Sequence, residues 1–205
     1  MSPYDELAEL GSATVHEAAG RIGVTDVDWI QVIPGSRACG PARIARCGQD
    51  DNLMVHAVME TVEPGDVIVL SMPEAKPVAL IGDLLATQAK KRGAAAVLVN
   101  GATRDVEDLR ELGLPIWTRW VRVRGARKDE YGALDVPVDV GGATINPGDT
   151  VVLDVDGVVV VPRDQTDSAL KASRARLEKE RVKREKLQGG ALSWEIDGLK
   201  EKFAP

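Results

Sequence analysis

The stretch "GDLLATQAKKRGAAAVLVNGATRDV", residues 82–106, decides the fold because it contains a complete helix-to-strand crossover. The segment "DLLATQAKKRG" is typical of a helix that ends at Gly93. The following "AAAVLVNGA" is a short apolar strand, as found in parallel sheets covered on both faces. A strand-like run, "AKPVALI", precedes the helix. The stretch therefore predicts a strand–helix–strand unit, which is right-handed in nearly all parallel sheets.

The segments around this crossover are richer in turns and hairpins. "EPGDVIVLSMP" and "NPGDTVVLDVDGVVVVP" each place a Pro–Gly turn before an apolar strand. Within the second, Asp156–Gly157 lies between two Val-rich runs, which is a strong hairpin signal. Upstream we expect a helix over residues 5–22, with Ser12 or Thr14 as a cap. Two short strands and a helix capped within residues 50–52 should follow. The whole predicts a compact mixed α/β sandwich and not a regular doubly wound sheet.

Composition limits the classes of function. The chain has 205 residues, 44% apolar and 28% charged, which suits one soluble domain with or without an appendage. Its net charge of −6 argues against a non-specific nucleic-acid binder. Its longest apolar stretches fall short of the ~20 residues of a membrane span. The first residues lack a signal-peptide core, and Cys39 and Cys47 lack zinc-site spacing, so we expect a cytoplasmic protein.

The composition changes near Asp164. Residues 164–188 predict a long, highly charged helix with few large apolar residues: Leu170, Leu177, Val182 and Leu187. This helix is either a solvated surface helix or an arm that lies across a neighbouring subunit. The apolar residues of "LSWEIDGLKEKF", 192–203, need a surface to cover, which favours the arm. We therefore divide the chain into an α/β domain, 1–163, and a helical arm, 164–205.

Candidate chemistry gathers at the two ends of the opening stretch. Backbone N–H groups at a helix start, here Gly82–Leu85, bind anions such as carboxylates. Arg104–Asp105 follows the next strand, where open α/β sheets place ligands. Arginine can pair with a carboxylate or an oxyanion, and aspartate can bind a divalent cation. The alternative is that Asp83 only caps its helix and that Arg104 and Asp105 form surface ion pairs.

Other common sites are absent from the sequence. It has no GxGxxG, Walker, HExxH or CxxC motif. Its two histidines, His16 and His56, both fall in predicted helices. Histidines in such positions are more often structural or surface residues than catalytic ones.

The spacing D-x20-R-D, formed by Asp83 and Arg104–Asp105, resembles the class II 4-hydroxy-4-methyl-2-oxoglutarate / 4-carboxy-4-hydroxy-2-oxoadipate aldolases. These enzymes share a superfamily with the regulator of ribonuclease activity A. The resemblance covers most of the chain, including "SATVHEAAGRIG", "DDNLMVHAVM", "PGDVIVL", "NGATRDV" and "LDVPVDVGGATINPGDTVVLDVDGVVVVP". It implies an α/β/β sandwich of the swivelling β/β/α type, with a C-terminal helical arm.

The resemblance also implies an activity. Such a chain would be a Mg²⁺- or Mn²⁺-dependent pyruvate aldolase that cleaves small 4-hydroxy-2-oxo acids and decarboxylates oxaloacetate. Asp105 would bind the metal directly, and Asp83 would act on it through water. Arg104 would contact the 2-oxo acid and stabilise its enolate. The substrate carboxylate would bind at the helix start, on Gly82, Leu84 and Leu85.

The resemblance further implies a homotrimer or homohexamer with active sites at subunit interfaces and no nucleic-acid or membrane partner. A glutamate from a neighbour's C-terminal helix would complete the metal shell through water. It falls at Glu180, with Glu178 and Glu185 close by.

The chain departs from the family pattern after the third strand of the crossover region. Trp120 stands where glycine is expected, and Arg122, Arg124 and Arg127 follow. These arginines either bind a distal carboxylate or are surface charge. The rival function is a non-catalytic, protein-binding regulator of a ribonuclease. Retention of Asp83 with Arg104–Asp105, together with the long arm, favours the enzyme.

Overall fold

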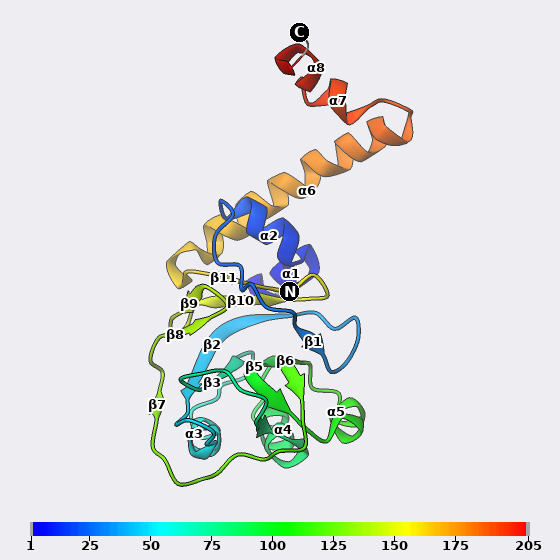
Figure 1. Ribbon diagram of the computed structural model, residues 1–205. Helices are drawn as coiled ribbons and strands as arrows, with labels where there is room; N and C mark the ends of the chain where they lie inside the picture. Colours follow the sequence, from blue (N-terminus) through cyan, green and yellow to red (C-terminus); the bar gives the residue numbers. More distant parts are fainter. Residues whose placement is uncertain (1, 204–205) are drawn as a thin grey trace.

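A computed structural model describes residues 2–203 and shows a curled mixed sheet between two groups of helices (Figure 1). The main sheet has the order β1-β6-β5-β3-β2-β10-β11, with β4 paired to β5 and β7 paired to β2. The parallel part comprises β2 (Ala38–Arg46), β3 (Val67–Ser71), β4 (Ala79–Ile81), β5 (Ala96–Thr103) and β6 (Ile116–Val121).

Antiparallel strands complete the sheet at both edges and add a small second sheet. These antiparallel strands are β1 (Ile30–Gln31), β7 (Ala133–Leu134), β10 (Thr150–Leu153) and β11 (Val158–Val161). The second sheet contains β8 (Val138–Val140) and β9 (Ala143–Ile145). The long strand β2 joins the two halves, since Ala38–Pro41 pair antiparallel with β10 and Ala42–Arg46 pair parallel with β3.

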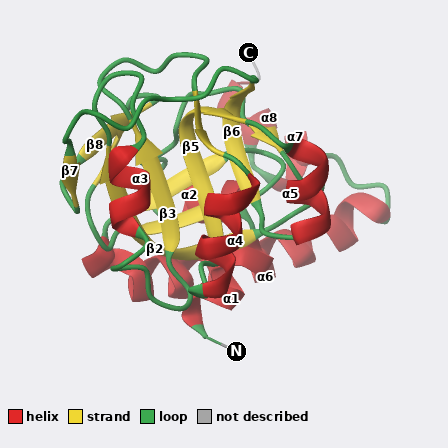
Figure 2. Cartoon of the chain, turned by 90° about the horizontal axis from the view of Figure 1, so that it is seen from below, coloured by secondary structure: helices red, strands yellow, loops and turns green. Residues whose placement is uncertain are grey.

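Helices cover the two outer faces (Figures 1 and 2). The parallel strands carry α3 (Leu53–Val58), α4 (Asp83–Lys91) and α5 (Val106–Leu112). The β10–β11 hairpin carries α1 (Pro3–Leu10), α2 (Ser12–Ala18) and the first part of α6 (Thr166–Gln188), which follows η1 (Arg163–Gln165). Three buried clusters fill the gaps between helices and strands, between the two halves of the curled sheet, and beneath α1, α2 and α6. The predicted α/β/β sandwich is confirmed.

The predicted crossover is confirmed as β4–α4–β5, with β4 and β5 parallel. Every residue of β5 is buried, as expected for a strand covered on both faces. The predicted Asp156–Gly157 hairpin is also confirmed, because β10 and β11 pair antiparallel from Thr150↔Val161 to Leu153↔Val158.

The predicted single helix over residues 5–22 is wrong, because the chain breaks at Gly11. Gly11 has φ +83°, a conformation that favours glycine, and it separates α1 from α2. Ser12 is not a cap. Its N–H and Oγ–H instead donate to the buried Asp154 carboxylate, at 2.7 and 2.6 Å. The cap of α1 is Ser2, which exchanges hydrogen bonds with Asp5.

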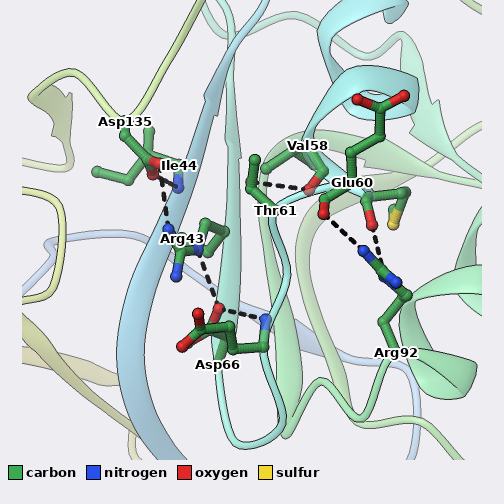
Figure 3. Close-up of polar contacts among 10 residues, drawn as sticks. Arg43, Ile44, Val58, Glu60, Thr61, Asp66, Arg92 and Asp135 are labelled. Carbon is green, nitrogen blue, oxygen red and sulfur yellow. Dashed lines mark hydrogen bonds and ion pairs between the residues drawn. The ribbon is translucent and has the colours of Figure 1, made fainter.

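Two arginines secure the strands and helices near β2 and α3 (Figure 3). Arg43 of β2 bridges Asp66 at 3.0 Å and Asp135 at 3.2 Å, which joins the turn before β3 to the segment after β7. Arg92, at the end of α4, donates to the Glu60 carbonyl at 2.5 Å. A cation beside carbonyls that follow a helix satisfies acceptors left free there.

The charged C-terminal helix is present, but its two halves differ. Ala169, Leu170 and Ser173 are buried against α1 and α2. The chain continues through two short helices, α7 (Ser193–Ile196) and α8 (Leu199–Phe203). The later part of α6 and these two helices, with the segment before α7, expose large apolar side chains: Leu177, Val182, Leu187, Leu192, Trp194 and Phe203. The proposed boundary at residue 164, and an arm on a neighbouring subunit, stay predictions. The last two residues of that arm lie outside the described part.

Two further sequence expectations concern the membrane and the thiols. Among residues 2–203, no helix combines the length and apolar character that a membrane span requires. Cys39 and Cys47 are buried and free. Burial, with help from the Asp51 charge, raises the pKa of Cys47 to about 12, so this thiol stays protonated at neutral pH.

A buried carboxylate fastens the loop after β6 to the start of α3. Asp51 is fully buried and accepts N–H groups from Leu53 at 2.7 Å, Asp129 at 2.6 Å and Glu130 at 3.1 Å. Burial alone would raise the pKa of this carboxyl. The three N–H donors, with the nearby charge of Arg127, outweigh burial and hold the pKa below its usual value.

Asp51→Asn should lower the free energy of unfolding at pH 7 by about 1–3 kcal/mol, because one buried N–H would meet an amide NH₂. The folded pKa of Asp51 lies below its unfolded value of about 3.9. Its contribution is therefore complete above that pH and is lost as the pH falls through the folded pKa. Urea unfolding at several pH values tests this, and the gap between wild type and variant should shrink below about pH 4.

Asp50→Asn is the matched control for this prediction. Asp50 has φ +57°, which asparagine tolerates, and its carboxylate accepts a side-chain bond from Gln49 at 2.8 Å. An Asp51 effect that does not change with pH, or that Asp50→Asn reproduces, would contradict the assignment.

Candidate active site

The β4–α4 junction and the β5–α5 junction form one site. Ile81 at the end of β4 is the parallel partner of Thr103 at the end of β5. The pairing continues past the strands, because the Arg104 N–H donates to the Ile81 carbonyl at 3.2 Å. One residue later, the Asp83 N–H donates to Asp105 Oδ2 at 3.3 Å. The structure thus brings both ends of the opening stretch together.

Gly82 makes this close approach possible. A Cβ at this position would lie 2.3 Å from Asp105 Oδ2 and 3.2 Å from the Arg104 side chain. Its backbone is extended, with φ −137°, so the requirement is space and not conformation. Any other residue would push the Asp105 carboxylate away from the start of α4.

Asp105 is held in an unusual backbone conformation. It has φ +60° and ψ +42°, the left-handed region that aspartate enters more readily than most residues. It precedes α5 without capping it, and its carboxylate instead faces the start of α4 and Arg104, with Nε–Oδ2 at 3.4 Å. Half of the Arg104 side chain and a third of the Asp105 side chain are exposed. Such an accessible pair stabilises the fold little and remains available to a ligand.

Asp83 does not serve as the cap of α4. Gly82 is the residue before the helix, and Asp83 is the first residue within it, with no side-chain bond to the helix start. The helix-cap explanation for Asp83 is therefore wrong. The backbone N–H groups of the first turn, which include those of Leu84 and Leu85, have no intrahelical partner and can receive an anion.

A cavity of about 200 Å³ opens beside this junction. One side of it comes from β4 and α4 with Arg104, and the other from α3 and the loop after β6. Its polar and charged lining residues are Asn52, His56, Asp83, Arg104 and Lys128. A second cavity of about 630 Å³ shares Arg104 and contains Asp105. Arg104 thus lines both cavities, together with Asp83 in the first and with Asp105 in the second.

Sequence reasoning missed three of these residues. Asn52 and His56 were assigned only to a helix and its cap, and Lys128 received no role. Partial burial, followed by the charge of Lys128, lowers the pKa of His56, so its imidazole is neutral at pH 7. These residues reach the site through backbone pairing between Asp51 and Arg127 and between Ala79 and Gly125. No sequence motif predicts that pairing.

The predicted arginines have different positions. None of Arg122, Arg124 and Arg127 lines the smaller cavity, and all three are exposed. Arg122 lines the larger cavity, whereas the backbones of Arg124 and Arg127 bond to Ala79 and to Asp50 and Asn52. The cation that this loop contributes to the smaller cavity is Lys128.

The donor set suits a hard divalent cation. Within residues 2–203 there is no group of three or more His, Cys, Asp or Glu side chains able to hold a metal. Asp83 and Asp105 supply only oxygen atoms. Mg²⁺ commonly binds through one or two carboxylates and keeps several waters, and Mn²⁺ accepts the same ligands. The two residues meet at one junction, where the Asp83 N–H lies 3.3 Å from Asp105 Oδ2, and their oxygen donors have the chemistry that such an ion prefers, without the Cys and His ligands typical of structural zinc sites.

Glu180 does not reach this site within one chain. It lies on α6, on the opposite side of the sheet from α4 and α5 (Figure 1), and pairs with Arg176 at 2.8 Å. The neighbouring candidates Glu178 and Glu185 both pair with Arg181. A role for Glu180 at the metal therefore requires a second subunit, as the resemblance implies.

Comparisons with known proteins identify the family to which the chain is similar. A family model described as RraA-like, aldolase/RraA, matches residues 12–160. A protein of Halalkalibacterium halodurans, provisionally named a 4-hydroxy-4-methyl-2-oxoglutarate aldolase, is 37% identical over 135 residues. That match covers 66% of this chain and 64% of the relative, so the chain spans somewhat less than two thirds of the relative's length.

Two solved structures extend the likeness. Streptomyces coelicolor RraAS2, described as an unusual member of the RNase ES inhibitor RraA protein family, is 32% identical with a TM-score of 0.79. The match covers 89% of this chain and 95% of that one. A Geobacillus kaustophilus structure titled S-adenosylmethionine: 2-dimethylmenaquinone methyltransferase is also 32% identical, with a TM-score of 0.64 over 69% and 87% of the two chains. By the family match and by these relatives, the chain belongs to the RraA-like (aldolase/RraA) family.

Proposed function

We propose that this protein is a divalent-metal-dependent lyase. It cleaves 4-hydroxy-4-methyl-2-oxoglutarate, 4-carboxy-4-hydroxy-2-oxoadipate or both to pyruvate and a second 2-oxo acid, and it also decarboxylates oxaloacetate. One observation carries this proposal: the start of α4 lies against Asp105 and Arg104, Asp83 lines a cavity together with Arg104, and the first-turn N–H groups of Leu84 and Leu85 have no intrahelical partner. The name of the Halalkalibacterium halodurans relative supports the same substrate class.

The reaction defines what the site must do. In retro-aldol cleavage the C3–C4 bond breaks, its electron pair forms the enolate of pyruvate, and the C4 hydroxyl loses its proton as C4 becomes a carbonyl. Decarboxylation of oxaloacetate breaks the corresponding bond to CO₂ and leaves the same enolate. A site that stabilises this enolate therefore supports both reactions.

The residues of this chain fit those tasks. The first turn of α4, at Leu84 and Leu85, receives the 2-oxo acid's carboxylate. Arg104 provides a fixed positive charge where the enolate oxygen develops its negative charge. Asp83 orients a water that takes the C4 hydroxyl proton. Asp105 and Asp83 would hold the divalent ion, which when bound would polarise the 2-oxo group as a Lewis acid.

Wild-type protein with Mg²⁺ or Mn²⁺ should release pyruvate from 4-hydroxy-4-methyl-2-oxoglutarate and from oxaloacetate, and a chelator should abolish both activities. Asp105→Asn should lower kcat/KM by more than about 100-fold, a loss beyond that of an outer-shell residue. Asparagine also tolerates the left-handed backbone, so the loss would not reflect a strained fold. Pyruvate formation, followed in a coupled assay, measures these rates.

Glu107→Gln, in the first turn of α5, is the matched control and should retain activity. Wild-type rates in Asp105→Asn would contradict the metal assignment. Catalytic silence toward both substrates, combined with capture of a ribonuclease, would instead favour the protein-binding function suggested by the Streptomyces coelicolor relative.

The same proposal includes a homotrimer or homohexamer whose active site is completed by Glu180 from a neighbour. The exposed apolar residues of α6 to α8 support an arm that covers another surface. Glu180 belongs to α6, which lies across the sheet from α4 and α5 (Figure 1), so a neighbour would have to donate it to the site.

Mixing two inactive variants tests this donation. Asp105→Asn and Glu180→Gln should each be inactive alone, whereas assemblies refolded from an equal mixture should regain part of the wild-type activity. In such mixtures some interfaces combine an intact Asp105 with an intact Glu180. Light scattering gives the size of the assembly, and Glu178→Gln and Glu185→Gln serve as controls. No regained activity, or a monomer with full activity, would contradict the shared site.

A further inference from the structure

Arg119 of β6 carries a half-buried positive charge that no carboxylate of the described residues balances. Its Nε–H donates to Asn100 Oδ1 at 2.5 Å, and Asn100 in turn donates to the Ser71 hydroxyl at 3.1 Å. None of the ion pairs within residues 2–203 includes Arg119. Partial burial accordingly lowers the pKa of this guanidinium. A cation that has lost part of its hydration gains more from an anion than a fully exposed one does.

Two tryptophans fix the position of this guanidinium. Its central carbon lies 6.0 Å from the ring centre of Trp29 and 5.9 Å from that of Trp120, the residue that stands where glycine is expected. Beside them, Ile30 of the edge strand β1 is 42% exposed. Asn100 engages Nε, so the edge formed by the two terminal nitrogens of Arg119 is the one that can bind a carboxylate. We call Trp29, Ile30, Arg119 and Trp120 the β6 platform.

The end of the C-terminal arm, residues 192–203, forms an apolar tip. Leu192, Trp194 and Phe203 are exposed, and the Trp194 and Phe203 rings stack with their centres 6.5 Å apart. Lys183 of α6 binds Asp197 at 2.6 Å, which fastens the tip to the arm. Figure 1 shows α7 and α8 beyond the end of α6, away from β1 and β6. The tip therefore does not cover the β6 platform of its own chain.

Glu195 is the carboxylate of the tip that is best placed to pair with a new cation. It follows Trp194 directly, its side chain is more than half exposed, and its ion pair with Lys200 is long, at 4.0 Å. Asp197 is already paired, and the Glu201 carboxylate lies beside the residue that precedes its own helix. The tip thus offers an indole and a carboxylate, which complement the indoles and the guanidinium of the β6 platform.

The reach of the arm agrees with such a contact. Trp120 pairs with Ala102 of β5, two residues before Arg104, which places the platform within about 10 Å of the candidate active site. From Glu180 to Gln188, α6 rises about 12 Å before the tip begins. A neighbour that brings Glu180 to the site can therefore bring its tip to the platform. A contact between two different surfaces can repeat around a closed ring, which suits the proposed trimer.

Tryptophan and arginine are the residues that most often dominate the energetics of protein interfaces. We propose that the β6 platform binds the arm tip of a second copy of this chain, where Arg119 pairs with Glu195 of that copy and Trp194 packs beside Trp29 and Trp120. This contact rests on the assembly in the proposed function and is independent of its chemistry. It anchors the far end of the arm, so that the part of α6 before the tip is held across the neighbouring subunit.

Sedimentation equilibrium of the full chain, without substrate or metal, measures this contact. Arg119→Glu and Glu195→Arg should each raise the dissociation constant of the assembly more than about tenfold, because like charges then meet. Both changes in one chain bring opposite charges together again, and the dissociation constant should return to within about threefold of the wild-type value. Arg46→Glu, an exposed arginine of β2, and Glu201→Arg, in the same tip, are the matched controls and should associate like wild type.

The outcomes separate this contact from the proposed reaction. A double variant that associates as weakly as the single variants, or a Glu195→Arg chain that associates like wild type, would overturn the contact. Because Glu195 is exposed and its variant should fold, the second result decides even where Arg119→Glu does not fold. A wild-type chain that stays monomeric would overturn the contact and the proposed assembly together. The turnover assays judge the aldolase reaction separately, since the association is measured without substrate.

Discussion

The parallel pairing of β4 with β5 is the interaction on which the candidate site depends. Ile81 and Thr103 are partners at the ends of these strands, and the Thr103 hydroxyl donates to the Ile81 carbonyl at 3.0 Å. This pairing makes the next residues on both strands neighbours, so that a helix start meets an arginine and an aspartate. The carboxyl ends of parallel strands lie at one edge of a sheet, which is where open α/β folds bind ligands. Here the fold itself produces the crevice.

Two backbone requirements then set the geometry of the crevice. Gly82 leaves the volume that the Asp105 carboxylate occupies, and the left-handed conformation of Asp105 directs that carboxylate away from its own helix. A carboxylate that capped α5 would be the more ordinary arrangement. A residue held in a sparsely populated conformation where it meets an arginine and a helix start is typical of a functional site.

The sequence predicted the parts of the structure that depend on local pattern. The crossover, the hairpin at Asp156–Gly157 and the long charged helix can each be recognised from short stretches of sequence. Their signals are the spacing of apolar residues, the residues that end helices and the residues that form turns. The helix over residues 5–22 was wrong because the chain breaks at Gly11, next to Ser12, which bonds to Asp154, 142 residues away in sequence. Asn52 and Lys128 were missed because contacts between distant parts of the sequence bring them to one cavity. Their meeting depends on bonds between Asn52 and Arg127 that no local signal contains.

The buried Asp51 links the stability of the fold to the geometry of the candidate site. Asp51, just before α3, accepts hydrogen bonds from the Asp129 and Glu130 N–H groups. The same loop contains Lys128, which lines the cavity together with Asn52. The interaction that stabilises this part of the fold thus also sets the far wall of the candidate site. Arg104 and Asp105, by contrast, are accessible and weakly coupled to stability. The candidate site therefore combines a wall held by buried hydrogen bonds with an accessible, charged edge.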